Sequence, residues 1–144
     1  MSQTPSLPQM ICFALYSANH AMQRIYQPLL APLGLTYPQY LVLLVLWGQD
    51  DQTVGDLGRA LQLETNTLTP LLKRMEAQGL LTRARSRQDE RQVRIRLTDK
   101  GRELQDQAGR IGECILTACD MELDHLTALR DAVVELRDRL RPAA

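Results

Sequence analysis

Residues 63–96 decide the fold, and they read LETNTLTPLLKRMEAQGLLTRARSRQDERQVRIR. Apolar residues recur at helical spacing in the first half and Gly79 follows them, which predicts a helix over about 65–78. Apolar and polar residues then alternate over 80–85 and again over 92–97, on either side of a polar loop. This alternation predicts the two strands of a hairpin that follows the helix directly.

A shorter helix precedes this segment. Thr53, with Asp56 three residues later, is a helix-start pattern, and the helix that it begins runs to about Leu61. Two short helices with a brief turn between them are typical of a helix-turn-helix. With the hairpin, here called the wing, they predict a winged helix-turn-helix over 37–97, in a chain that is mainly α-helical with a small β-wing.

An almost wholly apolar helix is expected over 37–48, where residues 41–47 read LVLLVLW. Thr36 and Gln39 form a capping-box pattern at its start. A helix that is apolar on every side is normally buried. We therefore expect this helix to be the centre of the core.

Long helices are expected at both ends of the chain, over 9–31 and over 99–140. In the second range, one helix capped by Thr98 runs to about Ala118 and another follows it. Both ends carry apolar stripes that the winged part does not cover, and helix-turn-helix proteins usually dimerise to match two half-sites. We expect a single domain over 1–144, in which the terminal helices form a dimerisation region.

The composition argues against several classes of protein. The chain has 144 residues, no apolar run long enough to span a membrane, and no basic N-terminal stretch of the kind that begins a signal peptide. Its three cysteines include no CxxC pair, which argues against a zinc site and a disulfide scaffold. We expect a cytoplasmic protein with no metal and no cofactor.

The formal net charge is zero, but the charges are unevenly distributed. Arg and Lys dominate over 83–102, whereas Asp and Glu dominate over 103–138. A basic segment in a neutral chain favours a local anionic partner. The alternative is a solvated strand pair that happens to be rich in arginine.

The helix over 65–78 and the wing carry the candidate DNA-binding residues. Short polar side chains near the start of the helix can reach base edges or phosphates, namely Thr65, Asn66, Thr67 and Thr69. Basic side chains in both elements are candidates for phosphate contacts, namely Lys73, Arg74, Arg83, Arg85, Arg87, Arg94 and Arg96. Arg91 is in the wing loop, where an arginine can enter a narrow minor groove, and we expect Asp89 and Glu90 to hold it in position.

Four segments give the pattern a specific resemblance. DERQVRIRLTDKGR at 89–102 resembles the wing of the MarR family of winged-helix regulators. CFALYS at 12–17, LTYPQY at 35–40 and LTPLLKR at 68–74 look like the OhrR branch of that family, which senses organic hydroperoxides. The resemblance, over about 9–140, implies a homodimeric repressor of a pseudo-palindromic double-stranded operator. It also implies that oxidation of one N-terminal cysteine releases the DNA.

The resemblance assigns roles in this thiol switch. Cys12 falls on the family's peroxide-reactive position, and Tyr26 and Tyr37 fall on the positions of two tyrosines that hydrogen-bond the reactive sulfur. A phenol that donates to a thiolate favours the charged form and lowers the pKa of the cysteine. The first product of oxidation is then a sulfenic acid. From its spacing alone, Cys12 is more simply a small buried apolar residue.

Some proteins of this branch have a second cysteine, which traps the sulfenic acid as an intersubunit disulfide. Cys114 and Cys119 are the candidates here, although each needs a shift to reach the expected position. Five residues along a helix correspond to about 140° of rotation, so at most one of them can point at Cys12 of a partner, and Cys114 is slightly favoured. If neither reacts, a low-molecular-weight thiol must cap Cys12. The remaining alternative is that both pack at the core edge.

Three other functions fit parts of the pattern. A MarR-type regulator can release its DNA on binding a phenolic or other small ligand in the dimer cleft. A thiol peroxidase would use Cys12 catalytically, but no second catalytic motif is evident, and we expect no enzyme. A purely structural helical dimer leaves the basic wing unexplained.

Overall fold

The computed structural model describes residues 4–142, which form one compact unit up to Ile111 and a second from Gly112. The first unit contains the short helices η1 (Leu7–Gln9) and η2 (Ala31–Leu33), the helices α1 (Ile11–Leu30), α2 (Tyr37–Gly48), α3 (Val54–Leu61), α4 (Thr65–Ala77) and α5 (Asp99–Ala108), and the strands β1 (Gln52–Thr53), β2 (Leu81–Arg85) and β3 (Val93–Leu97). α6 (Ile111–Cys119) begins at the boundary, and α7 (Leu123–Leu140) lies in the second unit. The predicted mainly α-helical fold with a small β-wing is confirmed.

Short capping patterns set the helix starts of the winged part. The Gln39 backbone N–H donates to Thr36 Oγ1 at 3.4 Å, and the Thr36 N–H donates to Gln39 Oε1 at 3.2 Å. Thr53 and Asp56 form the same reciprocal pair at the start of α3, at 3.0 and 3.1 Å. Both predicted helix starts are therefore confirmed. Gly34 follows η2 and has a φ of 69°, a left-handed conformation that glycine adopts without steric cost.

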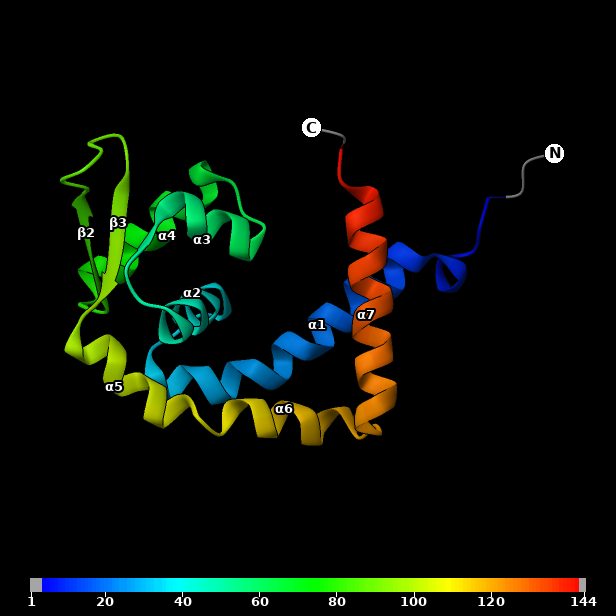
Figure 1. The fold of residues 1–144 in the computed structure, drawn as a ribbon. Helices are drawn as coiled ribbons and strands as arrows, with labels where there is room; N and C mark the ends of the chain where they lie inside the picture. Colours follow the sequence, from blue (N-terminus) through cyan, green and yellow to red (C-terminus); the bar gives the residue numbers. More distant parts are fainter. Residues whose placement is uncertain (1–3, 143–144) are drawn as a thin grey trace. The chain divides into compact units, whose positions relative to one another are not determined.

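The core of the first unit is built on α2 and is aliphatic. Val42, Leu43 and Leu46 of α2 are buried, as expected, although Leu44 is exposed. The predicted inward face of α4 is buried as well, and it consists of Leu68, Leu71, Leu72 and Met75. Figure 1 shows α3, α4 and the β2–β3 ribbon gathered near α2 at one end of this unit, with α1 leading away from them.

The junction between the wing and α5 is tightly packed. Trp47 of α2 donates its indole N–H to the Gly101 carbonyl oxygen at 2.9 Å. Gly101 itself approaches the wing so closely that a Cβ at this position would overlap the carbonyl oxygen of Leu80. Only glycine fits there, so α5 is fixed against the base of the wing.

The wing is part of a three-stranded antiparallel sheet in the order β1-β3-β2. Leu81 pairs with Leu97 across β2 and β3, and Arg85 pairs with Val93. β1 adds Gln52 opposite Ile95. This third strand was not predicted, because a strand of two residues shows no alternation. The third strand ties the wing to the start of α3.

The predicted single helix from Thr98 to about Ala118 is wrong. α5 ends at Ala108 and α6 begins at Ile111. Between them, the Gly109 N–H donates to the Asp106 carbonyl oxygen at 3.4 Å, three residues back instead of the four of an α-helix. Glycine is a poor helix former because it loses the most backbone entropy, and the apolar stripe that we followed continues across the break.

Within residues 4–142, no single helix has the length and apolar character needed to cross a membrane. Residues Ile11–Leu33 and Tyr37–Gly48 meet those two criteria only as a pair, with a bend of 72° between them.

Candidate DNA interface and thiol site

α4 presents the predicted base-reading side chains to solvent. Glu64, in extended conformation, precedes the helix, and Thr65 is its first residue. Thr65, Asn66 and Thr67 are exposed and Thr69 is half-buried, because the inward positions of this turn are taken by leucines. The basic residues Lys73 and Arg74 are exposed further along the same helix.

A concave surface brings several of the predicted residues together. It has a volume of about 610 Å³ and lies between the start of α3, the face of α4 and the wing. Thr65 and Thr69 line it from α4, and Arg83 and Arg91 line it from the wing. Arg59 of α3 adds a cation to this surface that we did not predict. Polar groups at the start of a helix therefore face wing arginines across one hollow.

Arg91 is the most open of the wing cations that make an ion pair, with a side chain that is 91% exposed. Asp89 accepts from both the backbone N–H of Arg91, at 3.1 Å, and its Nε, at 3.2 Å. Glu90 was expected to help, but it offers only its carbonyl oxygen, and to Arg85 Nη1 at 3.1 Å. Asp89 is thus the carboxylate that orients Arg91.

Several wing arginines are engaged within the protein. Glu76 of α4 accepts from the Arg83 backbone N–H at 2.9 Å and from its Nε at 3.3 Å. These bonds, the backbone one first, hold the pKa of Glu76 below its ordinary value. The side chain of Arg83 is only 25% exposed. Arg83 therefore braces the wing against α4, whereas Arg85 and Arg87 are exposed.

Asp51 is a functional candidate that the sequence did not reveal. Arg94 Nε lies 2.8 Å from Asp51 Oδ1, and Arg96 Nε lies 3.0 Å from the same oxygen. Arg94 also donates through Nη2 to the Asp51 carbonyl oxygen at 2.7 Å. The hydrogen bonds from Arg96 and Arg94 lower the pKa of Asp51. Its sequence signal is only the pair of acidic residues Asp50 and Asp51, because the arginine partners in β3 lie far along the chain from it.

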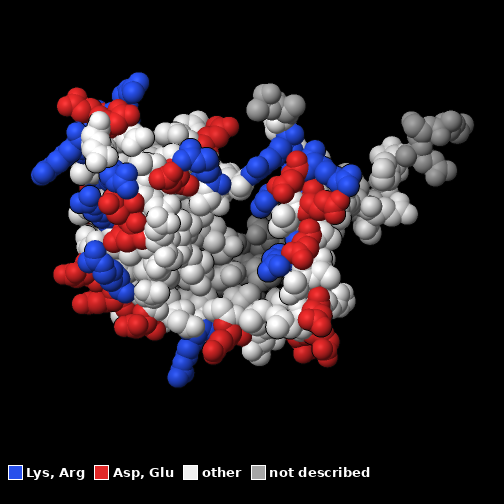
Figure 2. Space-filling model, in the orientation of Figure 1, with Lys and Arg blue, Asp and Glu red and all other residues white. Residues whose placement is uncertain are grey.

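These pairings change the character of the wing surface. Over the wing, at the left of Figure 2, basic and acidic side chains alternate instead of forming a uniformly positive area. The local excess of arginine is therefore partly neutralised by Asp51, Glu76 and Asp89. The unneutralised positive charge is concentrated at Arg85 and Arg87, and at Lys73 and Arg74 of α4.

The two predicted tyrosines do meet. The ring centroids of Tyr26 in α1 and Tyr37 in α2 are 4.7 Å apart, and that of Tyr40 is 5.9 Å from Tyr26. Burial raises the pKa of Tyr37, and burial followed by the nearby Tyr37 raises that of Tyr40. These two phenols stay protonated at neutral pH and keep an O–H to donate. Tyr26 and Tyr37 also line a hollow of about 450 Å³, together with Leu30 and Leu35.

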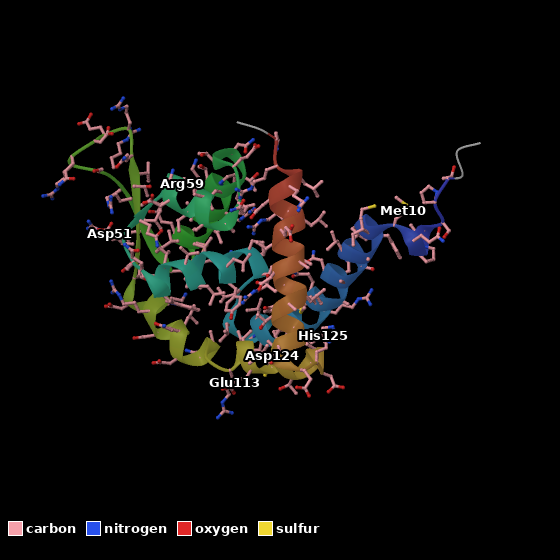
Figure 3. The ribbon with its side chains drawn as sticks, turned by 45° about the vertical axis from the view of Figure 1, so that its right-hand side comes forward. Met10, Asp51, Arg59, Glu113, Asp124 and His125 are labelled. Atoms are coloured by element: carbon pink, nitrogen blue, oxygen red, sulfur yellow. The ribbon has the colours of Figure 1, made fainter. Side chains whose placement is uncertain are left out.

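Cys12 is remote from this pair within the chain. It is exposed in the first turn of α1, which is not the placement of a buried apolar residue. Tyr26 follows about 14 residues later on the same helix, roughly 21 Å further along its axis. Figure 3 shows Met10, just before α1, at the opposite end of the first unit from Asp51. One chain therefore assembles the tyrosines but not the thiol with them.

The other two cysteines lie in the second unit, on α6. Cys114 is exposed, Cys119 is half-buried, and all three cysteines are free thiols. Over the described part of the chain, no group of three or more His, Cys, Asp or Glu side chains is placed to hold a metal ion.

Known proteins share both the sequence and the fold. Residues 24–108 match the family described as transcriptional regulator SarA/Rot. The HTH-type transcriptional regulator TtmR of Methylorubrum extorquens (strain PA1) is 49% identical over an aligned stretch of 149 residues, which covers 100% of this chain and 76% of TtmR. The organic hydroperoxide resistance transcriptional regulator of Bacillus subtilis (strain 168) is 45% identical over 134 residues, 93% of this chain and 91% of that protein.

Among solved structures, AbfR of Staphylococcus epidermidis is similar in two states. Reduced AbfR bound to DNA has a TM-score of 0.78 at 36% identity, covering 94% of each chain. Disulfide-formed AbfR has a TM-score of 0.62 at 37% identity, covering 93% of this chain and 89% of that one. The relatives are regulators of transcription and not enzymes. This chain belongs to the MarR/SarA family of winged-helix transcriptional regulators, which bind DNA.

Proposed function

We propose that this protein is a homodimeric repressor that binds a pseudo-palindromic DNA operator and releases it when an organic hydroperoxide oxidises Cys12. The hollow in which the polar start of α4 faces Arg91 of the wing carries the DNA-binding half of the proposal. The exposed Cys12 and the 45% identity to a hydroperoxide resistance regulator support the redox half. Such a regulator acts where the DNA is, in the cytoplasm, and its thiol chemistry needs no cofactor.

The contacts with DNA divide between two elements. Thr65, Asn66, Thr67 and Thr69 reach base edges or phosphates from the start of α4. Arg91, oriented by Asp89, enters the minor groove. Exposed cations bind phosphates on either side, namely Lys73, Arg74, Arg85 and Arg87. The structure of reduced AbfR bound to DNA supports this use of the fold.

A second copy of the chain is part of the proposed active form. In the first unit, α1 exposes the large apolar side chains Ile11, Phe13 and Ile25. In the second unit, α7 exposes Leu129 and Val133. Apolar surface of this kind marks an interaction site, and a two-fold dimer presents its two copies of α4, the recognition helix, to half-sites about 34–36 Å apart.

The dimer also completes the thiol site. Tyr26 and Tyr37 of the same chain are too distant to bond Cys12, so the tyrosine pair that stabilises its thiolate comes from the second copy. The thiolate sulfur attacks one oxygen of the hydroperoxide and the O–O bond breaks. The alkoxide leaves with the electron pair and takes up a proton to become an alcohol. The sulfur has lost two electrons and is now a sulfenic acid.

A second thiol resolves this sulfenic acid. Its sulfur attacks the oxidised sulfur of Cys12, a disulfide forms, and water leaves with the proton of the attacking thiol. Cys114 is the better candidate because it is exposed, whereas Cys119 is half-buried. A low-molecular-weight thiol performs the same step if neither cysteine reaches Cys12. Disulfide-formed AbfR supports the first route.

Release by a small ligand is the second candidate function. It is favoured by the hollow of about 450 Å³ beside Tyr26 and Tyr37, which is large enough for a phenolic molecule. The name of the relative TtmR, at 49% identity, specifies no signal. In this case Cys12 would be dispensable, and the hollow would hold the effector.

The two candidates are separated by measuring DNA affinity and thiol state together. The protein first selects a duplex operator from a random pool. Its affinity for this duplex is then measured before and after cumene hydroperoxide, for the wild type and for Cys12→Ser, Cys114→Ser and Cys119→Ser, with a non-reducing gel of each sample. We expect peroxide to release the wild type and leave Cys12→Ser bound, with the crosslinked species lost in Cys114→Ser. A wild type that stays bound after oxidation would refute the redox half alone.

A further inference from the structure

Gln39 is a polar side chain in an apolar place. It lies in the first turn of α2 and is only 4% exposed, whereas glutamine is ordinarily a surface residue. A buried amide is costly unless both its oxygen and its nitrogen find partners. Its contacts therefore show what it holds together.

The two ends of the Gln39 amide have different partners. Its Oε1 accepts the Thr36 N–H at 3.2 Å, and its Nε2 donates to Gln78 Oε1 at 3.0 Å. Gln78 in turn donates through Nε2 to the Gly34 carbonyl oxygen at 3.5 Å. Because a backbone N–H can only donate, the oxygen of Gln39 must face Thr36, which fixes the direction of the other two bonds. We call the Gln39–Gln78 pair the amide bridge.

The amide bridge joins the tyrosine pair to the recognition helix. Tyr37 precedes Gln39 in the same turn of α2, and its ring packs on that of Tyr26 at 4.7 Å. At the other end, Gln78 is the C-cap of α4, where its N–H donates to the Arg74 carbonyl oxygen at 3.0 Å. The Gln78 carbonyl oxygen also accepts from Lys100 Nζ of α5 at 2.8 Å. A displacement of α2 at Tyr37 therefore pulls directly on the end of α4.

We propose that Gln39 and Gln78 are positioning residues that make the orientation of the recognition helix depend on the state of the tyrosine pair. This inference rests on the proposed function, because it states how a change beside Cys12 reaches the DNA. α4 runs as a single helix from Thr65 to Ala77 despite Pro70 in its interior, and its apolar face is buried, so a shift at Gln78 turns the start of the helix at Thr65. Without the bridge, the tyrosine pair can move while α4 stays in place.

The variants that test this differ in which hydrogen bonds of the amide bridge they keep. Gln78→Leu removes both bonds of the Gln78 amide, and Gln39→Leu removes the bridge from the other side together with the bond that Gln39 accepts from the Thr36 N–H. Gln78→Glu keeps an oxygen that accepts from Gln39 Nε2 and loses only the donor to Gly34. Gln107→Leu changes an exposed glutamine on α5 and serves as the control. Operator affinity is measured for the reduced and the peroxide-treated form of each, with the oxidation rate of Cys12.

We expect the wild type, Gln107→Leu and Gln78→Glu to lose operator affinity about 50-fold on oxidation. Gln39→Leu and Gln78→Leu should bind DNA within about threefold of the wild type when reduced and lose less than about fivefold when oxidised. Their Cys12 should oxidise at the wild-type rate, so that their smaller loss of operator affinity cannot be caused by slower oxidation of the thiol. An undiminished loss of affinity in both leucine variants would overturn the inference.

A second arm does not depend on peroxide. Tyr37→Ala removes the ring that packs on Tyr26, and we expect it to change the operator affinity of the reduced protein about fivefold or more. In the Gln39→Leu background the same substitution should change that affinity less than about twofold. An equal change of operator affinity in both backgrounds, or no change in either, contradicts the proposal that the amide bridge couples the tyrosine pair to α4. If peroxide does not release the wild type, the redox proposal fails and this arm still decides the inference.

Discussion

The winged part and the thiol site differ in how much of each lies within one chain. The wing is braced by its own chain, through Asp51 to Arg94 and through Glu76 to Arg83. Cys12, by contrast, is exposed and lies roughly 21 Å along α1 from Tyr26, so one chain does not bring the thiol and the tyrosine pair together. In the proposed function, the first region has its working geometry in a single copy, whereas the second requires two.

In the proposed function, this difference separates a DNA-binding surface that one chain completes from a sensing site that needs two. Caps, ion pairs and an aliphatic core hold the surface that we propose binds DNA, so one chain is enough to form it. The proposed sensing site forms only when a second copy supplies the tyrosine pair, so oxidation of Cys12 there would alter how the two copies fit together.

The largest effect is expected on the free energy of unfolding, at the junction between α5 and the wing. Gly101→Ala places a Cβ against the Leu80 carbonyl oxygen, and we expect it to lower the free energy of unfolding by about 2–4 kcal/mol. Gly48→Ala, where a Cβ meets open space, should change it by less than about 0.5 kcal/mol. Urea unfolding measures both. Equal stabilities would mean that α5 is not fixed against the wing.

A smaller effect, on operator affinity, is expected at the exposed tip of the wing. Arg91→Ala removes the side chain that we place in the minor groove, and it should weaken operator binding by about 1–3 kcal/mol. Arg130→Ala, on α7 and paired with Asp131, should leave the affinity unchanged. Fluorescence anisotropy with a labelled duplex gives both values. An unaffected Arg91→Ala protein would remove the wing tip from the interface.

The local parts of this architecture could be predicted from the sequence, and the distant parts could not. The caps at Thr36 and Thr53 involve residues three apart, and the wing strands alternate visibly, so both were found. Asp51 was missed because its arginine partners are remote in sequence. The same holds for the contact between Gln39 and Gln78. The break at Gly109 was missed because the apolar stripe runs through it.

The ion pairs of the wing lead to a finer test. Arg87 is exposed and should bind phosphate, so Arg87→Gln should make the dependence of log affinity on log salt shallower by about 0.9 for each phosphate that it no longer neutralises. Arg94 is already held by Asp51, so Arg94→Gln should weaken binding without changing this slope. Titrations at several salt concentrations give the two slopes. A shallower slope for Arg94→Gln would show that Arg94 leaves Asp51 for the DNA.

The smallest effect concerns pH. Hydrogen bonds from Arg96 and Arg94 lower the pKa of Asp51 in the folded protein. A lowered pKa adds stability above the unfolded value, about 3.9 for aspartate, and this stability is lost as the pH falls through the folded value. Thermal unfolding of the wild type should therefore depend more steeply on pH below about 4 than that of Asp51→Asn. The same pH dependence of thermal unfolding in both proteins below pH 4 would show that the ion pairs of Asp51 do not stabilise the fold.

The most direct test of the comparison uses mixed dimers that contain a single reactive Cys12. One dimer combines a Cys12→Ser chain with a Tyr37→Phe chain, so that the remaining thiol faces an intact tyrosine pair only if the site is shared between copies. The other combines a wild-type chain with a Cys12→Ser, Tyr37→Phe chain, so that the thiol and the intact tyrosine are in the same copy. We predict that cumene hydroperoxide oxidises the first dimer at the wild-type rate per thiol and the second more slowly. The reverse order would show that the thiol site is complete within one chain.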